Sequence, residues 1–205
     1  MEAATLRKML CYGDSNTFGY NPRSYWGGPY PDDVRWTGIL HAKGWDVLNC
    51  GQNGREIPST EGGLQAAERL IYSAMPVDIV TVMLGTNDFL NHPHFTAGDV
   101  AARMERLLQA LRSRSHRMEI LLIAPPPLRD GVWTPDARII RESAYLADEY
   151  CALADRMGVG FADAGEWDIT LDFDGVHFSP EGHAAFAKYL LKTLEVFTLA
   201  SCPGR

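Results

Sequence analysis

The sequence of 205 residues lacks the features that mark several classes of protein. Lys and Arg (19) are fewer than Asp and Glu (26) and are scattered, so the formal net charge of −7 argues against nucleic acid as a partner. No apolar run is long enough to span a bilayer, which argues against a membrane partner. The N-terminal residues have no long apolar region or cleavage site of a secretory signal, so a cytoplasmic location is expected.

Motifs for metals and nucleotides are also missing. His92 and His94 flank Pro93, but no third ligand stands at a recognisable spacing, so we expect no metal. Neither a GxGxxG sequence nor a Walker loop occurs, and we expect no cofactor. The four cysteines have no CxxC spacing and are expected to be reduced thiols. They are Cys11, Cys50, Cys151 and Cys202.

The sequence does contain five apolar runs of strand length that alternate with segments of helical spacing. The runs are 8–12, 45–50, 77–84, 118–124 and 159–162, and most are rich in Val, Ile or Leu, as in parallel strands covered on both faces. The helical segments are 35–43, 60–73, 97–115, 138–157 and 180–194. This alternation predicts an α/β three-layer αβα fold in a single domain over residues 1–205. We expect its five-stranded parallel sheet to be flavodoxin-like, with the order 2-1-3-4-5.

Polar residues directly follow the first three predicted strands, at the edge where open parallel sheets bind ligands. Ser15 follows the first strand in a Gly-Asp-Ser sequence, as an exposed nucleophile or as a serine that caps a helix. Gly51 and Gly54 follow the second strand, where a glycine N–H can approach a developing oxyanion or simply serve a turn. Asn87 follows the third strand and can supply an oxyanion donor or satisfy local backbone.

A carboxylate and a histidine follow the last predicted strand. Asp174 stands three residues before His177, a spacing that lets a carboxylate orient an imidazole whose other nitrogen faces a serine. In the order 2-1-3-4-5 the first strand lies between the second and third, so Ser15 would have Gly54 on one side and Asn87 on the other, at strand spacings of roughly 4.8 Å. The connection to His177 is long enough to reach back to Ser15.

These blocks together resemble the four-block signature of the GDSL/SGNH hydrolases over nearly the whole chain. The similarity is greatest to the small arylesterase/acyltransferase branch, in segments 33–38, 83–88, 125–128 and 174–178. The resemblance implies a triad and an oxyanion hole without a cofactor. The triad is Ser15, Asp174 and His177, and the oxyanion donors are Ser15, Gly54 and Asn87.

Two of these roles have alternatives. Arg55 follows Gly54, which departs from the commoner Gly-Asp pattern of this block, so Gly51 remains a second candidate donor. Asp172 remains a rival of Asp174, although its spacing to His177 fits the motif less well.

The resemblance implies a serine esterase that hydrolyses or transfers short acyl groups from small esters through an acyl-enzyme. Absence of a GxSxG elbow disfavours an α/β-hydrolase. The alternatives are a carbohydrate esterase of the same family that removes acetyl groups from sugars, and a flavodoxin-like binding module without catalysis. Trp26, Tyr30 and Trp133 stand in long loops and are expected to bind substrate, by stacking on a sugar or by walling an apolar pocket. The same loops suit a homo-oligomer.

Overall fold

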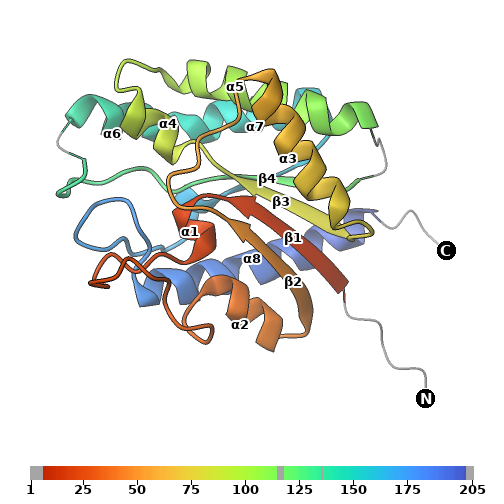
Figure 1. The fold of residues 1–205 in the computed structure, drawn as a ribbon, viewed down its shortest axis with the longest axis horizontal. Helices are drawn as coiled ribbons and strands as arrows, with labels where there is room; N and C mark the ends of the chain where they lie inside the picture. Colours follow the sequence, from red (N-terminus) through yellow and green to blue (C-terminus); the bar gives the residue numbers. More distant parts are fainter. Residues whose placement is uncertain (1–6, 115–117, 135, 202–205) are drawn as a thin grey trace.

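The computed structural model describes residues 7–114, 118–134 and 136–201, which include a five-stranded parallel sheet with helices on both faces (Figure 1). The strand order, β2-β1-β3-β4-β5, confirms the prediction. The strands are β1 (Arg7–Gly13), β2 (Trp45–Gly51), β3 (Ile79–Met83), β4 (Ile120–Ala124) and β5 (Gly160–Asp163).

Two helical layers cover the sheet, with α2 and α8 on one face and α3, α5 and α7 on the other (Figure 1). The helices are α1 (Ser15–Phe18), α2 (Trp36–Ala42), α3 (Glu61–Ser73), α4 (Thr86–Asn91), α5 (Ala97–Arg114), α6 (Ala137–Ala144), α7 (Leu146–Met157) and α8 (Pro180–Ser201), with a 3₁₀ turn η1 (Ala164–Glu166).

Successive residues of β1 divide between the two layers. Leu10 and Tyr12 belong to the hydrophobic cluster that includes α5 and α7 side chains, whereas Met9 and Cys11 belong to the cluster that includes α2 and α8 side chains. All four are buried. Burial on both faces explains why the strand is a continuous apolar run instead of an alternating one.

One predicted helix is wrong in its length. Residues 138–157 form two helices, α6 and α7, which meet at Tyr145. The Ser143 hydroxyl donates to the Ile140 carbonyl and accepts from the Leu128 N–H, which fixes the end of α6 over the loop after β4. No proline or glycine marks this break. The short helix α4 was likewise not expected from the sequence, whereas a helix at Ser15 was one of the two readings of the Gly-Asp-Ser sequence, and α1 begins there.

The first three strands end level with one another. Gly13, at the end of β1, pairs with Gly51 of β2 and with Met83 of β3. The segments that follow these strands therefore leave the sheet side by side, and the segment before α8 returns to the same edge.

The cysteines, the helix lengths and the acidic and histidine side chains bear on three further expectations. Cys11, Cys50 and Cys151 are free thiols, and Cys202 lies outside the described residues. Across the described ranges, no helix combines the length and apolarity needed to cross a membrane. Within the same ranges, no group of three or more His, Cys, Asp or Glu side chains is arranged to hold a metal ion.

Candidate active site

Ser15 is the first residue of α1, directly beyond the end of β1. The Asp14 carboxylate caps this helix by accepting the Asn16 N–H at 2.9 Å, and Gly19 ends it in the left-handed conformation. First-turn N–H groups have no acceptor within a helix, so the Ser15 N–H is directed out of α1. The local sequence thus holds the hydroxyl and the N–H of one residue at the edge of the sheet.

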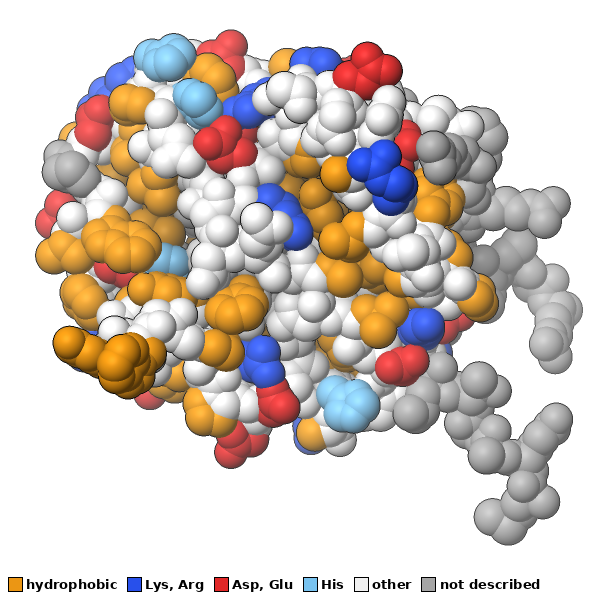
Figure 2. Space-filling model, in the orientation of Figure 1, with side chains coloured by type: hydrophobic (Ala, Val, Ile, Leu, Met, Phe, Trp, Pro, Cys, Tyr) orange, Lys and Arg blue, Asp and Glu red, His pale blue; other side chains and the backbone are white. Residues whose placement is uncertain are grey.

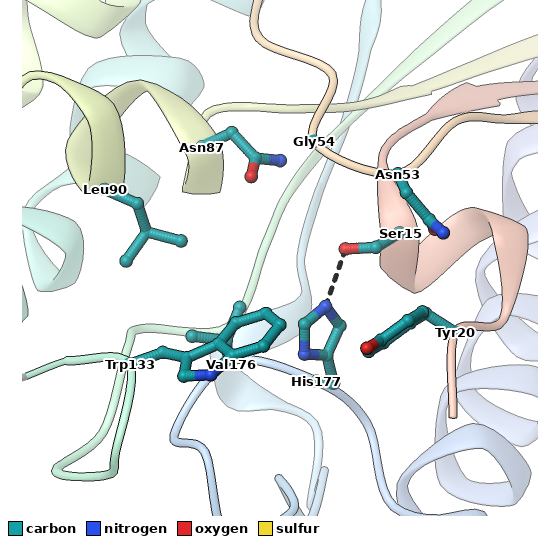
Figure 3. A pocket seen from close by; sticks show the side chains of 9 residues that line it. All are labelled: Ser15, Tyr20, Asn53, Gly54, Asn87, Leu90, Trp133, Val176 and His177. Atoms are coloured by element: carbon teal, nitrogen blue, oxygen red, sulfur yellow. Dashed lines mark hydrogen bonds between the residues drawn. The ribbon is translucent and has the colours of Figure 1, made fainter. Parts of the chain in front are cut away.

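His177 connects Ser15 to a buried carboxylate. Its Nε2 lies 2.9 Å from Ser15 Oγ (Figure 3), and its Nδ1 lies 2.6 Å from Asp174 Oδ2. Asp174 Oδ1 accepts the N–H groups of Val176 and His177, each at 2.9 Å. Burial alone raises the pKa of Asp174, but the hydrogen bonds from His177 and the two N–H groups outweigh it and hold that pKa below its ordinary value. Asp174 is therefore ionised and oriented toward the imidazole.

Asp172, the rival carboxylate, is occupied elsewhere. Its two oxygens accept from Arg23 Nη2 at 2.5 Å and Nε at 3.0 Å, and the Tyr30 hydroxyl lies 3.4 Å from Oδ2. Its contact with His177 is through backbone, because the Asp172 N–H donates to the His177 carbonyl at 2.7 Å. Asp172 thus anchors the loop that contains Arg23 to the turn that contains His177.

The two candidate glycines differ in surroundings. Gly54 has a φ of +71° and lines the cavity beside Ser15 (Figure 3). Gly51 packs against α1 so closely that an added Cβ would lie 2.1 Å from the Phe18 nitrogen, and its N–H donates to Asn49 Oδ1 at 2.9 Å. Packing accounts for Gly51, whereas Gly54 lines the cavity together with Ser15.

Asn87 faces Ser15 across the cavity from α4 (Figure 3). Its Nδ2 donates to the Arg55 carbonyl at 3.1 Å and lies 3.5 Å from Asp14 Oδ2. The Arg55 guanidinium in turn donates to the carbonyls of Gly13 and Cys50 at the ends of β1 and β2. Arg55, which replaces the commoner Asp after Gly54, therefore joins the Gly54 turn to the sheet and orients the Asn87 amide.

Buried carboxylates stand behind this side of the cavity. Burial raises the pKa of Asp14 to about 6, against the opposing influence of the Asn16 N–H, His177 and Arg55. Burial likewise raises the pKa of Asp88 to about 6, although its side chain accepts from the Ile57 N–H at 3.1 Å and from Arg103 at 2.6 Å. Asp88 thereby joins α4 to the loop that follows Gly54.

The cavity in front of Ser15 has a volume of about 380 Å³. The Tyr20 ring packs against the imidazole of His177 in a tilted arrangement and the Trp133 ring packs edge to face with it, with centroids 4.6 Å and 5.1 Å away. Among the described residues, no side chain that lines it is acidic or a lysine or arginine. The lining is Ser15, Tyr20, Asn53, Gly54, Asn87, Leu90, Trp133, Val176 and His177.

Of the three side chains expected to bind substrate, one lines the cavity. Trp133 does so and is 48% exposed. Tyr30 is 7% exposed, beneath the loop and against Asp172, and Trp26 is 89% exposed with its ring against Tyr25. Neither Tyr30 nor Trp26 lines the cavity. Their loop is held by the pairing of Arg23 with Asp172 and by backbone hydrogen bonds such as that from the Tyr30 N–H to the Gly19 carbonyl.

Several lining residues were not expected from the sequence. Tyr20, Asn53 and Leu90 line the cavity, and each stands within a few residues of a predicted site motif. That proximity in the sequence is the feature that could have indicated them. Large hydrophobic side chains are exposed on the surrounding loops. Figure 2 shows hydrophobic side chains gathered at the left of the face in view. In the same orientation, the strands of Figure 1 run toward the left.

Comparison with known proteins identifies the family. One family model matches residues 11–185, a range that contains every residue from Ser15 to His177. The chain belongs to the GDSL-like lipase/acylhydrolase family. The predicted resemblance to GDSL/SGNH hydrolases is confirmed, and this GDSL family member is an ester hydrolase by the same finding.

Solved structures of esterases are similar to this GDSL family member over most of its length. Est24, a carbohydrate acetylesterase from Sinorhizobium meliloti, is 29% identical with a TM-score of 0.79, and the match covers 93% of this chain and 99% of that one. The native aryl esterase of M. smegmatis is 28% identical with a TM-score of 0.78 and the same coverage. No match was found among curated proteins.

Proposed function

We propose that this protein is a serine esterase that hydrolyses, or transfers, short acyl groups from small uncharged esters. The observation that carries the proposal is the continuous chain of hydrogen bonds from Asp174 through His177 to Ser15, which ends at an oxygen that opens into the cavity. A volume of about 380 Å³ suits a small ester, and an uncharged lining supplies no partner for an ionic group on the substrate.

In this mechanism His177 Nε2 accepts the Ser15 proton while Oγ attacks the ester carbonyl carbon. The tetrahedral oxyanion that forms is stabilised by the N–H groups of Ser15 and Gly54 and by Asn87 Nδ2. His177 then gives its proton to the leaving alkoxide, and an acyl-enzyme remains. Water, or a second alcohol, is deprotonated by the same nitrogen and releases the acyl group. Asp174 stabilises the imidazolium in both halves of the reaction.

Chemical labelling and kinetics test this function together. Wild-type protein should hydrolyse p-nitrophenyl acetate and should gain the mass of one serine-directed phosphonate at Ser15. Ser15→Ala should lose the labelling and almost all of the turnover. Turnover by Ser15→Ala at the wild-type rate contradicts the nucleophile, and a wild-type protein that neither turns over nor labels favours the alternative of a binding module.

A carbohydrate acetylesterase is the second candidate, and the half-exposed Trp133 favours it. This indole lies at the cavity against His177, where an apolar ring face can stack on a sugar. Two of the similar solved structures are named as carbohydrate acetylesterases. Comparing kcat/KM for acetylated xylo-oligosaccharides and for phenyl acetate separates the two candidates.

A further inference from the structure

Asn16 occupies a position next to the nucleophile that the proposed reaction does not use. It follows Ser15 in α1 and is 4% exposed. Its backbone N–H donates to the Asp14 carboxylate at 2.9 Å, and its carbonyl accepts the Trp36 indole N–H at 2.8 Å. The backbone N–H and carbonyl of Asn16 are thus both engaged, and its side chain is not one of those that line the cavity.

The side-chain amide of Asn16 binds the backbone on both sides of His177. Its Nδ2 donates to the Val176 carbonyl at 3.1 Å, and its Oδ1 accepts the Phe178 N–H at 2.9 Å. These two bonds use the donor and the acceptor of the amide in the manner of a paired strand, and they enclose the backbone of residue 177. They cross 160 and 162 positions of sequence to join α1 to the turn before α8.

From this geometry we infer that Asn16 is a positioning residue, whose amide sets the separation between the base and the nucleophile. The inference rests on the proposed function of Ser15 and His177. Asp174 cannot set that separation, because it lies on the same turn as His177 and moves with it. Asn16 moves with Ser15, so its hydrogen bonds to the backbone of residues 176 and 178 fix the 2.9 Å distance from Ser15 Oγ to His177 Nε2.

The sequence of this chain makes the inference specific. The family is named for Gly-Asp-Ser-Leu, whereas this chain reads Gly-Asp-Ser-Asn at residues 13–16. Leucine has the same number of side-chain heavy atoms and the same branching as asparagine, but it is bulkier and neither donates nor accepts a hydrogen bond. Asn16→Leu therefore removes the two bonds to the His177 turn without leaving a cavity, and Asn16→Ala removes them without adding bulk.

The test compares Asn16→Leu and Asn16→Ala with wild type and with Asn49→Ala. Asn49 holds the same helix from β2, through bonds from Nδ2 to the Thr17 carbonyl and Thr37 hydroxyl, and within the described ranges no hydrogen bond joins its side chain to residues 176–178. The measurements are kcat and KM for p-nitrophenyl acetate, the rate of phosphonate labelling at Ser15, and the melting temperature of each protein.

A misplacement near 1 Å costs about a hundredfold in rate. We expect both Asn16 variants to lose kcat and labelling rate by about 10- to 100-fold with KM within about twofold, while Asn49→Ala keeps both rates within about threefold at a comparable melting temperature. Asn16 variants that fold and keep kcat within threefold overturn the inference, as does an equal loss of kcat in Asn49→Ala. Failure of wild type to be labelled would instead overturn the proposed function.

Discussion

Exchanging Asp174 for asparagine replaces one carboxylate oxygen with an NH₂ group, and the geometry of the site determines how the hydrogen bond to His177 changes. Asp174 Oδ1 accepts two backbone N–H groups, and Oδ2 faces His177 Nδ1 at 2.6 Å. In Asp174→Asn the amide oxygen must stay on the two N–H groups, because the opposite orientation would direct an NH₂ group at both donors. The NH₂ group therefore faces Nδ1, which has to accept a hydrogen bond.

The imidazole then carries its proton on the wrong nitrogen. Nε2, which lies 2.9 Å from Ser15 Oγ, becomes a donor and cannot accept the serine proton. In Ser-His-Asp enzymes this loss of the correct tautomer lowers kcat by about 10⁴-fold. We expect a loss of the same order for Asp174→Asn, which corresponds to about 5 kcal/mol in the activation barrier.

Asp172→Asn is the matched control, two residues earlier on the same turn. Asp172 is bound to Arg23 and does not face the imidazole nitrogens, so kcat for p-nitrophenyl acetate should fall by less than about tenfold. Circular dichroism should show both variants folded. An Asp174→Asn variant within tenfold of wild type refutes the reasoning, and so does an Asp172→Asn variant that is impaired as severely.

Two other perturbations follow from the opposite wall of the cavity. Asn87→Ala should lower kcat for phenyl acetate by about 10²- to 10³-fold, as expected for one lost oxyanion donor, while Asn91→Ala at the end of the same helix, where the amide binds Glu56, leaves kcat nearly unchanged. Asp14 has a pKa of about 6 in the folded protein and about 3.9 when unfolded, so the native state binds its proton more tightly and wild type loses about 2 to 3 kcal/mol of stability as pH rises from 4 to 7. Asp14→Asn has no such proton to lose. In urea unfolding at pH 4 and pH 7, the free energy of unfolding of the variant should therefore rise relative to that of wild type as pH rises. A difference between the two proteins that is the same at both pH values contradicts the assignment.

The convergence of the site residues could be predicted because it follows from strand direction. Parallel strands send their carboxyl ends to one edge, and the level ends of Gly13, Gly51 and Met83 bring the residues after them together. The order of the strands then decides which segments become neighbours of Ser15. The alternation of apolar runs and helices predicts a parallel sheet and hence the shared edge. The order 2-1-3-4-5 is one of two common orders of such sheets, and the alternation alone does not select it.

Side-chain directions in the loops could not be predicted in the same way. Tyr30 is buried beside Asp172 and Trp26 is exposed, in a loop whose Arg23 pairs with Asp172, a contact between residues 149 positions apart that no local pattern indicates. The break at Tyr145 depends on a hydroxyl that accepts an N–H from the loop after β4. Each of these features is set by one long-range hydrogen bond or ion pair, which a single sequence does not specify.

The position of His177 shows how an irregular segment becomes rigid enough for chemistry. Its two neighbours pack in opposite layers, Val176 in the cluster that includes α5 and α7, and Phe178 in the cluster that includes α2 and α8. The imidazole therefore stands where the two cores meet, at the end of the sheet that separates them. Asn16 binds the backbone of both neighbours at this point. Movement of the imidazole away from Ser15 would have to disturb both cores and the amide bonds, which explains how a turn without regular structure holds the proposed proton acceptor in place.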